Sequence, residues 1–211
     1  MGNEKQGFAQ KIGYQQKPKS KKNYLIRKNK IMLMFTKDFR EIFSAEILSI
    51  TGGLFAGTLL AFAVGKLELV PGILILLPGF LEMRGNISGS LSARLSSGLH
   101  LGVVKPKIEK NRAVKGNVIA SVILVILVSA VLGLVAYFAN MYFFGVNNAA
   151  IIFIALFAGI FSNVIEIPIT ILITFWLFRH GHDPNNIMGP YVTTIGDVVS
   201  ISSLLIAIVI I

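Results

Sequence analysis

Cysteine is absent from the 211 residues of the chain, and charged residues make up only 14% of it. Without cysteine, the protein has no disulfide framework, no thiolate metal site and no cysteine nucleophile. A typical globular domain is about 25% charged, so a soluble protein of this composition would lack enough polar surface to cover itself. Hydrophobic residues instead make up 54% of the chain and occur in long runs, which indicates an integral membrane protein.

Motifs of soluble chemistry are missing as well. The sequence has no GxxxxGK[ST] phosphate-binding loop, so nothing in it indicates ATP-driven pumping. We expect neither an enzyme nor a protein with a bound cofactor. His180, His182 and Asp183 resemble a metal cluster, but they fall in a short turn between hydrophobic runs. We interpret them as part of a solvated loop.

The N-terminal segment carries much of the positive charge. The formal net charge is +10, and residues 1–40 contain eleven of the lysines and arginines. Because a membrane domain follows directly, we expect this segment to attract anionic lipid and not nucleic acid. Residues 1–29 are predicted to be a disordered cytoplasmic tail. Residues 30–43 alternate hydrophobic and charged positions, which predicts an amphipathic helix in the membrane interface; the alternative is an extension of the first membrane helix.

Five hydrophobic segments follow within residues 44–211, which we interpret as the transmembrane domain. Each reaches or approaches the length of about 20 residues that crosses a bilayer as a helix. The sequence therefore predicts an all-α integral membrane protein with five transmembrane helices. The expected spans are 47–64, 69–91, 118–144, 149–178 and 187–211.

The basic loops predict the orientation of these spans. Lysine and arginine are enriched in the N-terminal segment and in the loop after the second span, and the turn after the fourth span contains Arg179, His180 and His182. The other two connections carry little charge. Since basic loops stay in the cytoplasm, we expect a multi-pass protein of the cell membrane, with a cytoplasmic N-terminus and the C-terminus outside.

Three of the predicted spans carry a polar stripe with one carboxylate each. Residues three or four positions apart share one face of a helix, and carboxylate, amide and hydroxyl oxygens are hard ligands suited to Mg²⁺ or Ca²⁺. We therefore predict a divalent-ion pathway; the alternative is that these groups hydrogen-bond between helices as packing contacts. The stripes are Glu82, Asn86 and Ser90 on the second span, Asn163, Glu166 and Thr170 on the fourth, and Thr193 and Asp197 on the fifth.

Arg84 opposes a simple cation pathway, because it adds positive charge to the second span. Two explanations are open. Arg84 pairs with Glu82 or Glu166, or it extends toward the cytoplasmic face. The Gly85-Asn86 step beside it indicates a second span that is bent or locally unwound, as broken helices at transport sites are.

Two stretches of the chain resemble a known family. Residues 84–97 read RGNISGSLSARLSS and follow a Val-Pro pair, and residues 183–197 read DPNNIMGPYVTTIGD. Both are similar to motifs in the second and fifth spans of the MgtE-type magnesium transporters and their animal solute-carrier relatives. The resemblance covers residues 35–211.

This resemblance implies a dimer whose ion path runs between subunits and is lined by the second and fifth spans. The family's ion-coordinating aspartate corresponds to Asp197. Its other path-facing positions correspond to Asn86, Ser90, Thr193 and the backbone carbonyl of Gly189. Glu82 and Glu166 are added as candidate ligands from the polar stripes alone.

The chain departs from the family's pattern in its accessory parts. A short basic tail stands where bacterial members carry a cytosolic magnesium-sensing domain, and animal relatives fuse two membrane domains in one chain. We therefore expect a homodimer, or pairing with a separately encoded sister half. The resulting hypothesis is a transporter of divalent cations, with Mg²⁺ as the substrate. The alternatives are an exchanger coupled to Na⁺ or H⁺, and a non-transporting membrane scaffold.

Overall fold

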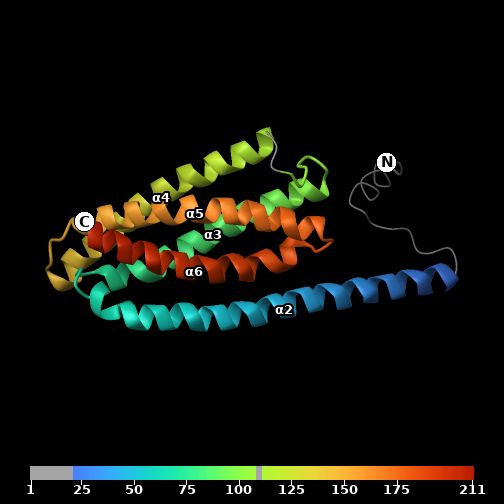
Figure 1. The fold of residues 1–211 in the computed structure, drawn as a ribbon, viewed down its shortest axis with the longest axis horizontal. Helices are drawn as coiled ribbons and strands as arrows, with labels where there is room; N and C mark the ends of the chain where they lie inside the picture. Colours follow the sequence, from blue (N-terminus) through green and yellow to red (C-terminus); the bar gives the residue numbers. More distant parts are fainter. Residues whose placement is uncertain (1–20, 108–110) are drawn as a thin grey trace, which may run out of the picture. The chain divides into compact units, whose positions relative to one another are not determined.

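The computed structural model describes residues 21–107 and 111–211, and within them it contains five helices and no strand. The helices, labelled in Figure 1, are α2 (Lys21–Leu67), α3 (Ile73–His100), α4 (Arg112–Phe144), α5 (Ala150–Arg179) and α6 (Pro184–Ile210). The chain divides into two units after Arg40, and the second unit, Glu41–Ile211, contains the bundle of helices.

The first helix is longer than the sequence predicts. α2 runs without a break from Lys21 to Leu67, so residues 21–29, expected to be disordered, are helical. Residues 30–43 continue directly into the first hydrophobic span, as the alternative interpretation of this segment expected. Their placement in the membrane interface stays a prediction, and residues 1–20 of the expected tail lie outside the described residues.

Four helices of the described chain are long and apolar enough to cross a bilayer. The segments are Met32–Leu67, Arg112–Phe144, Ala150–Arg179 and Pro184–Ile210. α3 has 28 residues, and at about 1.5 Å per residue it spans more than the roughly 30 Å of a hydrocarbon core. It is less apolar than the others because Glu82, Arg84, Arg94 and several serines lie on it. The fifth membrane crossing therefore stays a prediction for α3.

The ends of the helices follow from local sequence signals. Asn111 begins α4, and its side-chain oxygen accepts a hydrogen bond of 2.8 Å from the backbone N–H of Ala113. Asp183 begins α6 in the same way, with Pro184 at the first helical position. Gly72, with φ of 86°, begins α3 and lies against Asn140, whose amide donates to the carbonyl of Pro71 at 3.2 Å.

Successive helices of the second unit run in alternating directions (Figure 1). α3 and α5 occupy the centre of the bundle: they contact each other, and each also contacts α4 and α6. Hydrogen bonds join the connections at each end. Asn140 links the α2–α3 and α4–α5 turns, whereas His100 and Asp183 link the end of α3 to the α5–α6 turn at 3.2 Å.

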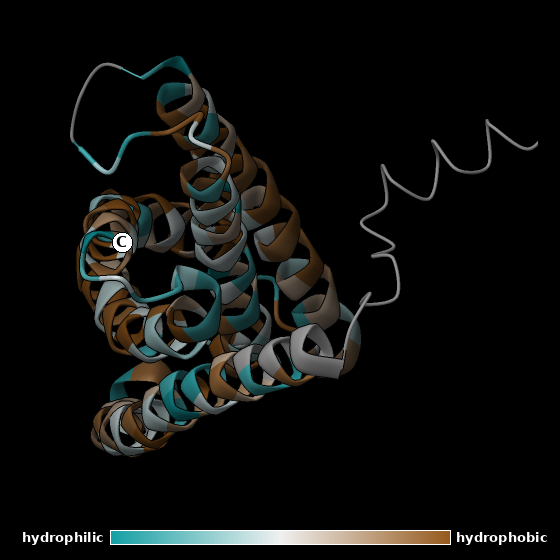
Figure 2. Ribbon diagram, turned by 90° about the vertical axis from the view of Figure 1, so that its right-hand side faces the viewer, coloured by the Kyte–Doolittle hydropathy of each residue, from teal (hydrophilic) through white to brown (hydrophobic). Residues whose placement is uncertain are grey.

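Hydrophobic residues cover most of the helix surfaces, and hydrophilic residues gather in the loops at the end that faces the viewer in Figure 2. The α3–α4 loop and the α5–α6 turn both lie at this end, because His100 and Asp183 join them. The two basic connections of the predicted topology therefore share one end of the bundle. The assignment of that end to the cytoplasm stays a prediction.

One of the two alternatives predicted for α3 is wrong. The Gly85-Asn86 step is not unwound, because α3 is a continuous helix from Ile73 to His100; a bend in this helix stays a prediction. Glycine lowers helix stability by only about 1 kcal/mol relative to alanine, and contacts with α4, α5 and α6 hold this helix on three sides. The break in the backbone lies instead at Pro71-Gly72, before the helix begins.

Candidate functional site

The polar stripe predicted on the second span lies on the surface of α3. Glu82, Asn86 and Ser90 are all exposed and follow one another at intervals of four residues. The Asn86 amide donates a hydrogen bond of 3.1 Å to the Glu82 carboxylate. The Ser90 hydroxyl donates to the backbone carbonyl of Ile87 at 3.1 Å. The three side chains therefore form one exposed row of oxygen atoms.

A second polar row lies on α6. Gly189 and Thr193 are exposed, and the Thr193 hydroxyl donates a hydrogen bond of 3.0 Å to the Gly189 carbonyl. Asp197 follows one turn later and is partly exposed. Its carboxylate makes no hydrogen bond or ion pair with the described part of the chain. It is thus the acidic group of α6 whose oxygens are left for an external partner.

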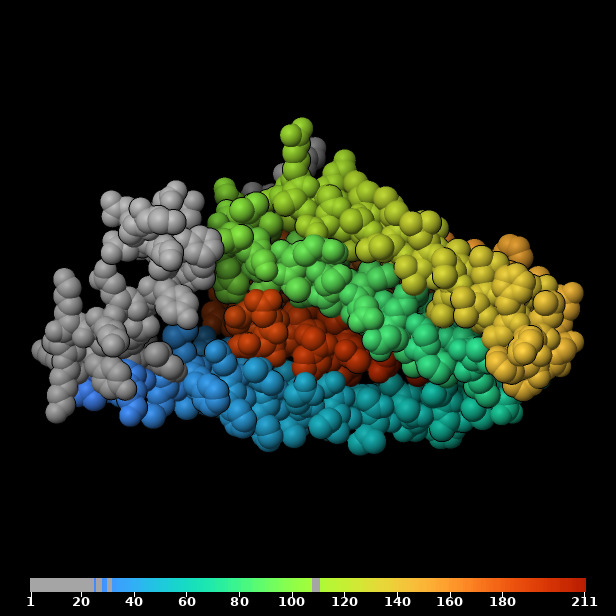
Figure 3. Space-filling model, turned by 180° about the vertical axis from the view of Figure 1, so that it is seen from behind, coloured from blue at the N-terminus to red at the C-terminus, as the bar shows by residue number. Residues whose placement is uncertain are grey.

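The two rows belong to neighbouring helices, since α3 packs against α6. Seen from behind, α6 lies between α3 and α2 on one face of the molecule (Figure 3). Each row extends over nine residues, that is eight steps along the helix, from Glu82 to Ser90 and from Gly189 to Asp197. At about 1.5 Å of rise per residue, each is roughly 12 Å long. We call these six residues the exposed polar face.

α2 joins this arrangement through close contact with α6. The Thr194 hydroxyl lies 3.0 Å from the Ser49 hydroxyl, and a side chain at Gly52 would collide with Thr194. Glu41 accepts hydrogen bonds from Asn186 at 3.1 Å and lies 2.9 Å from a ring nitrogen of His182. Thr194, next to Thr193 in sequence, thus faces α2, whereas Thr193 faces outward.

Arg84 lies on the opposite side of α3 from Glu82. Two residues turn a helix by about 200°, so the buried Arg84 cannot share the exposed row. Its Nη1 atom forms an ion pair with Oε1 of Glu166 on α5, and the Ser88 hydroxyl donates to the other Glu166 oxygen at 3.1 Å. Arg84 is 1% exposed and Glu166 is 2% exposed. The partner of Arg84, left open by the sequence, is Glu166.

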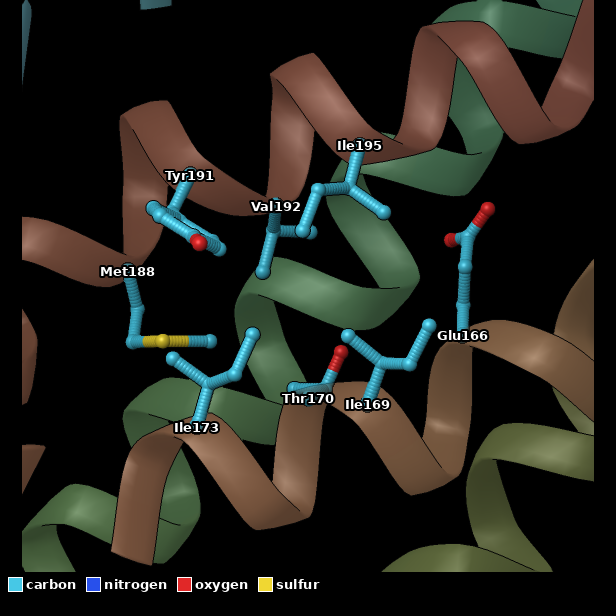
Figure 4. A pocket seen from close by; sticks show the side chains of 8 residues that line it. All are labelled: Glu166, Ile169, Thr170, Ile173, Met188, Tyr191, Val192 and Ile195. Atoms are coloured by element: carbon cyan, nitrogen blue, oxygen red, sulfur yellow. The ribbon is translucent and has the colours of Figure 1, made fainter. Parts of the chain in front are cut away.

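Glu166 is therefore separated from the other predicted ligands. Figure 4 shows it at the edge of a cavity between α5 and α6, with its carboxylate reaching toward α6. The cavity has a volume of about 10 Å³, and most of its lining is hydrophobic. That volume holds at most a single water. A hydrated divalent ion does not fit beside Glu166 in this arrangement.

The buried pair nevertheless lies directly behind Asp197. Arg84 packs against the backbone of Gly196, where a Cβ atom would lie 2.5 Å from Nη2 of the guanidinium and 3.9 Å from Oε1 of Glu166. Asp197 is the next residue along α6, so it is carried by the segment that packs against Arg84. Arg84 thus lies within the influence of two carboxylates, one buried and one partly exposed.

Two residues that surround the Arg84–Glu166 pair, Ser88 and Gly196, were not found by sequence reasoning. Ser88 follows Arg84 by one helical turn, so the same four-residue spacing that revealed the exposed row could have found it. Gly196 carries no such signal, because its part is to let α6 approach the guanidinium. We call Arg84, Ser88, Glu166 and Gly196 the buried cluster.

The histidines of the α5–α6 turn make pairwise contacts. His182 contacts Glu41, Asp183 contacts His100 at 3.2 Å, and His180 contacts the Trp176 carbonyl at 2.7 Å. Within the described residues, no three histidines, aspartates, glutamates or cysteines are grouped to hold a metal ion. The described residues of one chain therefore do not form a carboxylate-rich ion site.

Comparison with protein families gives a match to the model of MgtE, described as a divalent cation transporter, over residues 77–207. The chain belongs to the MgtE family of divalent cation transporters. The match runs from α3 almost to the end of α6 and therefore includes both polar rows and the buried cluster. Comparison with curated proteins and with solved structures gave no match.

Membership confirms the resemblance in residues 84–97 and 183–197. It makes the protein a member of a transporter family, not an enzyme family, and its substrate class a divalent cation. Together with the four apolar helices, it establishes a multi-pass membrane protein. The MgtE match begins inside α3, so α2 and the basic segment before it lie outside the matched region.

Proposed function

We propose that this MgtE protein transports Mg²⁺ through a path between two subunits, lined by the exposed polar faces of α3 and α6. Asp197 is the principal ligand of the ion. Asn86, Ser90, Thr193 and the carbonyl of Gly189 supply neutral oxygens, and Glu82 supplies a second carboxylate at one end of the row. α3 serves as the fifth membrane-spanning helix.

The observation that carries this proposal is the exposure of polar side chains on helices of a membrane protein. Ionisable and polar groups within membrane helices face a bundle interior or a water-filled cavity, because their contact with hydrocarbon is unfavourable. In one copy of the chain, Glu82, Asn86 and Thr193 face outward. A second copy, or a sister half, placed against this face removes them from lipid and leaves a hydrated space between the subunits.

The composition of the exposed polar face suits Mg²⁺. This ion gives up its water reluctantly and is usually held by one or two carboxylates together with several retained waters. The Asn86 amide group donates to Glu82, so its oxygen remains the atom available to a cation. Two copies of Asp197 would provide two carboxylates, and the remaining oxygens would contact the ion through its water shell.

The basic end of the bundle supports an orientation with the α3–α4 loop and the α5–α6 turn in the cytoplasm. His100 and Asp183 bring these two connections together. The opposite end contains the uncharged α4–α5 turn. The C-terminus then lies outside.

Replacement of Asp197 by asparagine tests the proposal. Purified protein is reconstituted in vesicles, and Mg²⁺ uptake is followed with a trapped indicator. D197N is expected to abolish uptake, since the principal charge of the path is lost while the side-chain shape is kept. The matched control is D183N on the same helix: asparagine begins a helix as well as aspartate does, and uptake should persist.

Uptake by D197N at the rate of the unaltered protein would contradict the assignment. Repeating the measurement with and without Na⁺ or H⁺ gradients separates uncoupled transport from coupled exchange. An uptake rate that is the same with and without both gradients excludes coupled exchange. Absence of Mg²⁺ uptake by the unaltered protein, together with uptake of no other divalent ion, would favour the scaffold alternative.

A further inference from the structure

Arg84 is an unusual residue to lie behind a cation path. Its guanidinium is held by Glu166 and packs against Gly196, the residue before Asp197. It therefore lies between a carboxylate that faces the protein interior and one that faces the proposed path. The arrangement raises the question of which carboxylate neutralises Arg84, because the other one stays available to the transported ion.

The contacts favour Glu166 as the neutralising group. Glu166 is buried, forms the ion pair and has its second oxygen bonded to Ser88 at 3.1 Å. Asp197 is partly exposed and has no hydrogen-bond partner in the described part of the chain. A buried charge is strongly unfavourable unless it is paired. Arg84 and Glu166 therefore satisfy each other in the interior.

We propose that Glu166 is a positioning residue for transport: it holds the guanidinium of Arg84 and so keeps the Asp197 carboxylate free to bind the ion. This inference rests on the proposed function and deepens it, because it assigns a role to a charged pair that does not touch the path. One positive and two negative charges then leave a net charge of −1 at Asp197.

Gly196 makes the arrangement possible. Because this residue has no side chain, α6 approaches the guanidinium closely enough that an added Cβ atom would lie 2.5 Å from Nη2. Asp197 follows Gly196 directly and is therefore carried by the part of α6 that packs against Arg84. Loss of the negative charge at Glu166 would leave Arg84 buried without a partner, and Asp197 is the carboxylate available to replace it.

The consequence is an antagonism between Arg84 and the transported ion. In the E166Q protein, Arg84 pairs with Asp197, and a divalent cation must compete with this internal cation. Because the divalent cation must displace Arg84 from Asp197, the half-saturating Mg²⁺ concentration should rise by about tenfold or more. Removal of Arg84 in the same protein should abolish the competition.

The experiment compares E166Q, the double variant R84Q/E166Q and D197N in the vesicle assay, with rates given per folded protein. We expect E166Q to raise the half-saturating concentration, the double variant to return it to within about threefold of the original value, and D197N to remain inactive. Glutamine keeps the shape of the Glu166 side chain and can retain the hydrogen bond to Ser88, and at position 84 it removes the positive charge. Thermal unfolding of each purified variant gives the folded fraction independently.

Three results would overturn the inference. The first is E166Q with an unchanged half-saturating concentration, and the second is a double variant as impaired as E166Q, which would make Glu166 a ligand in its own right. The third applies if E166Q does not fold, because the double variant then provides the only test. In that case, a tenfold rise in the half-saturating Mg²⁺ concentration of the double variant would overturn the inference. Failure of the proposed function looks different, because the unaltered protein would then not transport.

Discussion

Charged side chains on the two faces of α3 have different surroundings. On the inner face, Arg84 is buried and pairs with Glu166 of α5, whose second oxygen accepts a hydrogen bond from the hydroxyl of Ser88 on α3. On the outer face, Glu82, Asn86 and Ser90 are exposed, and the hydrogen bonds of Asn86 and Ser90 join them to other residues of α3. The interior charge is therefore matched within one copy of the chain, whereas the exterior row is not.

This difference distinguishes groups that build the protomer from groups that await a partner. A buried ion pair stabilises the fold mainly by comparison with a protein in which one of the two charges is buried without its partner. Unmatched polar groups on a membrane helix require water or a second protein surface. Substitutions on the inner face should therefore affect folding first, and substitutions on the outer face should affect transport first.

The largest effect on folding is expected from R84M. This change leaves the Glu166 carboxylate buried without a cation, and removing one partner of a buried ion pair typically destabilises a protein by about 3–5 kcal/mol. The measurement is the free energy of unfolding in lipid–detergent micelles. R84M should be more destabilising than E166Q, because Arg84 has Asp197 as a second partner whereas Glu166 has no second cation in the cluster.

The control for this comparison is the double variant R84M/E166M. Replacing both ions by hydrophobic side chains is often neutral or stabilising, so most of the lost stability should return. If R84M alone unfolds like the original protein, Glu166 is not held as a buried charge, and the contrast between the two faces of α3 is broken.

The glycines offer the same contrast between packed and open positions, with a smaller effect. Gly133 lies at the α4–α5 contact, where a Cβ atom would come within 2.9 Å of the Ile152 backbone, whereas Gly57 on α2 has no atom within 4 Å of such a position. G133A should destabilise by about 1–3 kcal/mol, because the two helices must separate. G57A should be neutral or slightly stabilising, since alanine favours the helix.

Unfolding of both variants under identical conditions gives the difference directly, and each protein serves as the control of the other. Equal stability of G133A and G57A would show that α4 and α5 do not approach as closely as the structure indicates. A loss of stability confined to G57A would show that the open side of α2 is covered by a partner.

Sequence patterns predicted the helices and both exposed rows, because hydrophobic length and four-residue spacing are local properties. Spacing placed Asn86 and Thr193 on polar faces of their helices, and family resemblance placed both on the ion path. The structure exposes both side chains, and their contact with an ion stays a prediction. The sequence left open whether Arg84 pairs with Glu82 or Glu166 or extends toward the cytoplasmic face. The choice of Glu166 depends on how α3 and α5, 82 residues apart at these positions, are rotated against each other. Helix continuity at Gly85-Asn86 was missed because tertiary contacts override a weak local preference.

The smallest effect on folding, with a clear effect on transport, is expected from N86A. Asn86 is exposed, and its amide contacts only Glu82 one turn away. A surface substitution of this kind usually changes stability by no more than about 0.5 kcal/mol. Loss of an oxygen near the ion should nevertheless raise the half-saturating Mg²⁺ concentration by about tenfold, as the loss of groups around metal ligands does.

The matched control for N86A is N117A on α4. Asn117 donates a hydrogen bond of 2.9 Å to the Ala113 carbonyl of its own helix and lies on neither polar row. Its replacement should leave both folding and uptake unchanged. If N86A and N117A transport alike, the outer row of α3 does not line the path, and its exposed oxygens serve contacts between subunits. A fall in the stability of the N86A protomer would instead mean that the outer face is also part of the fold.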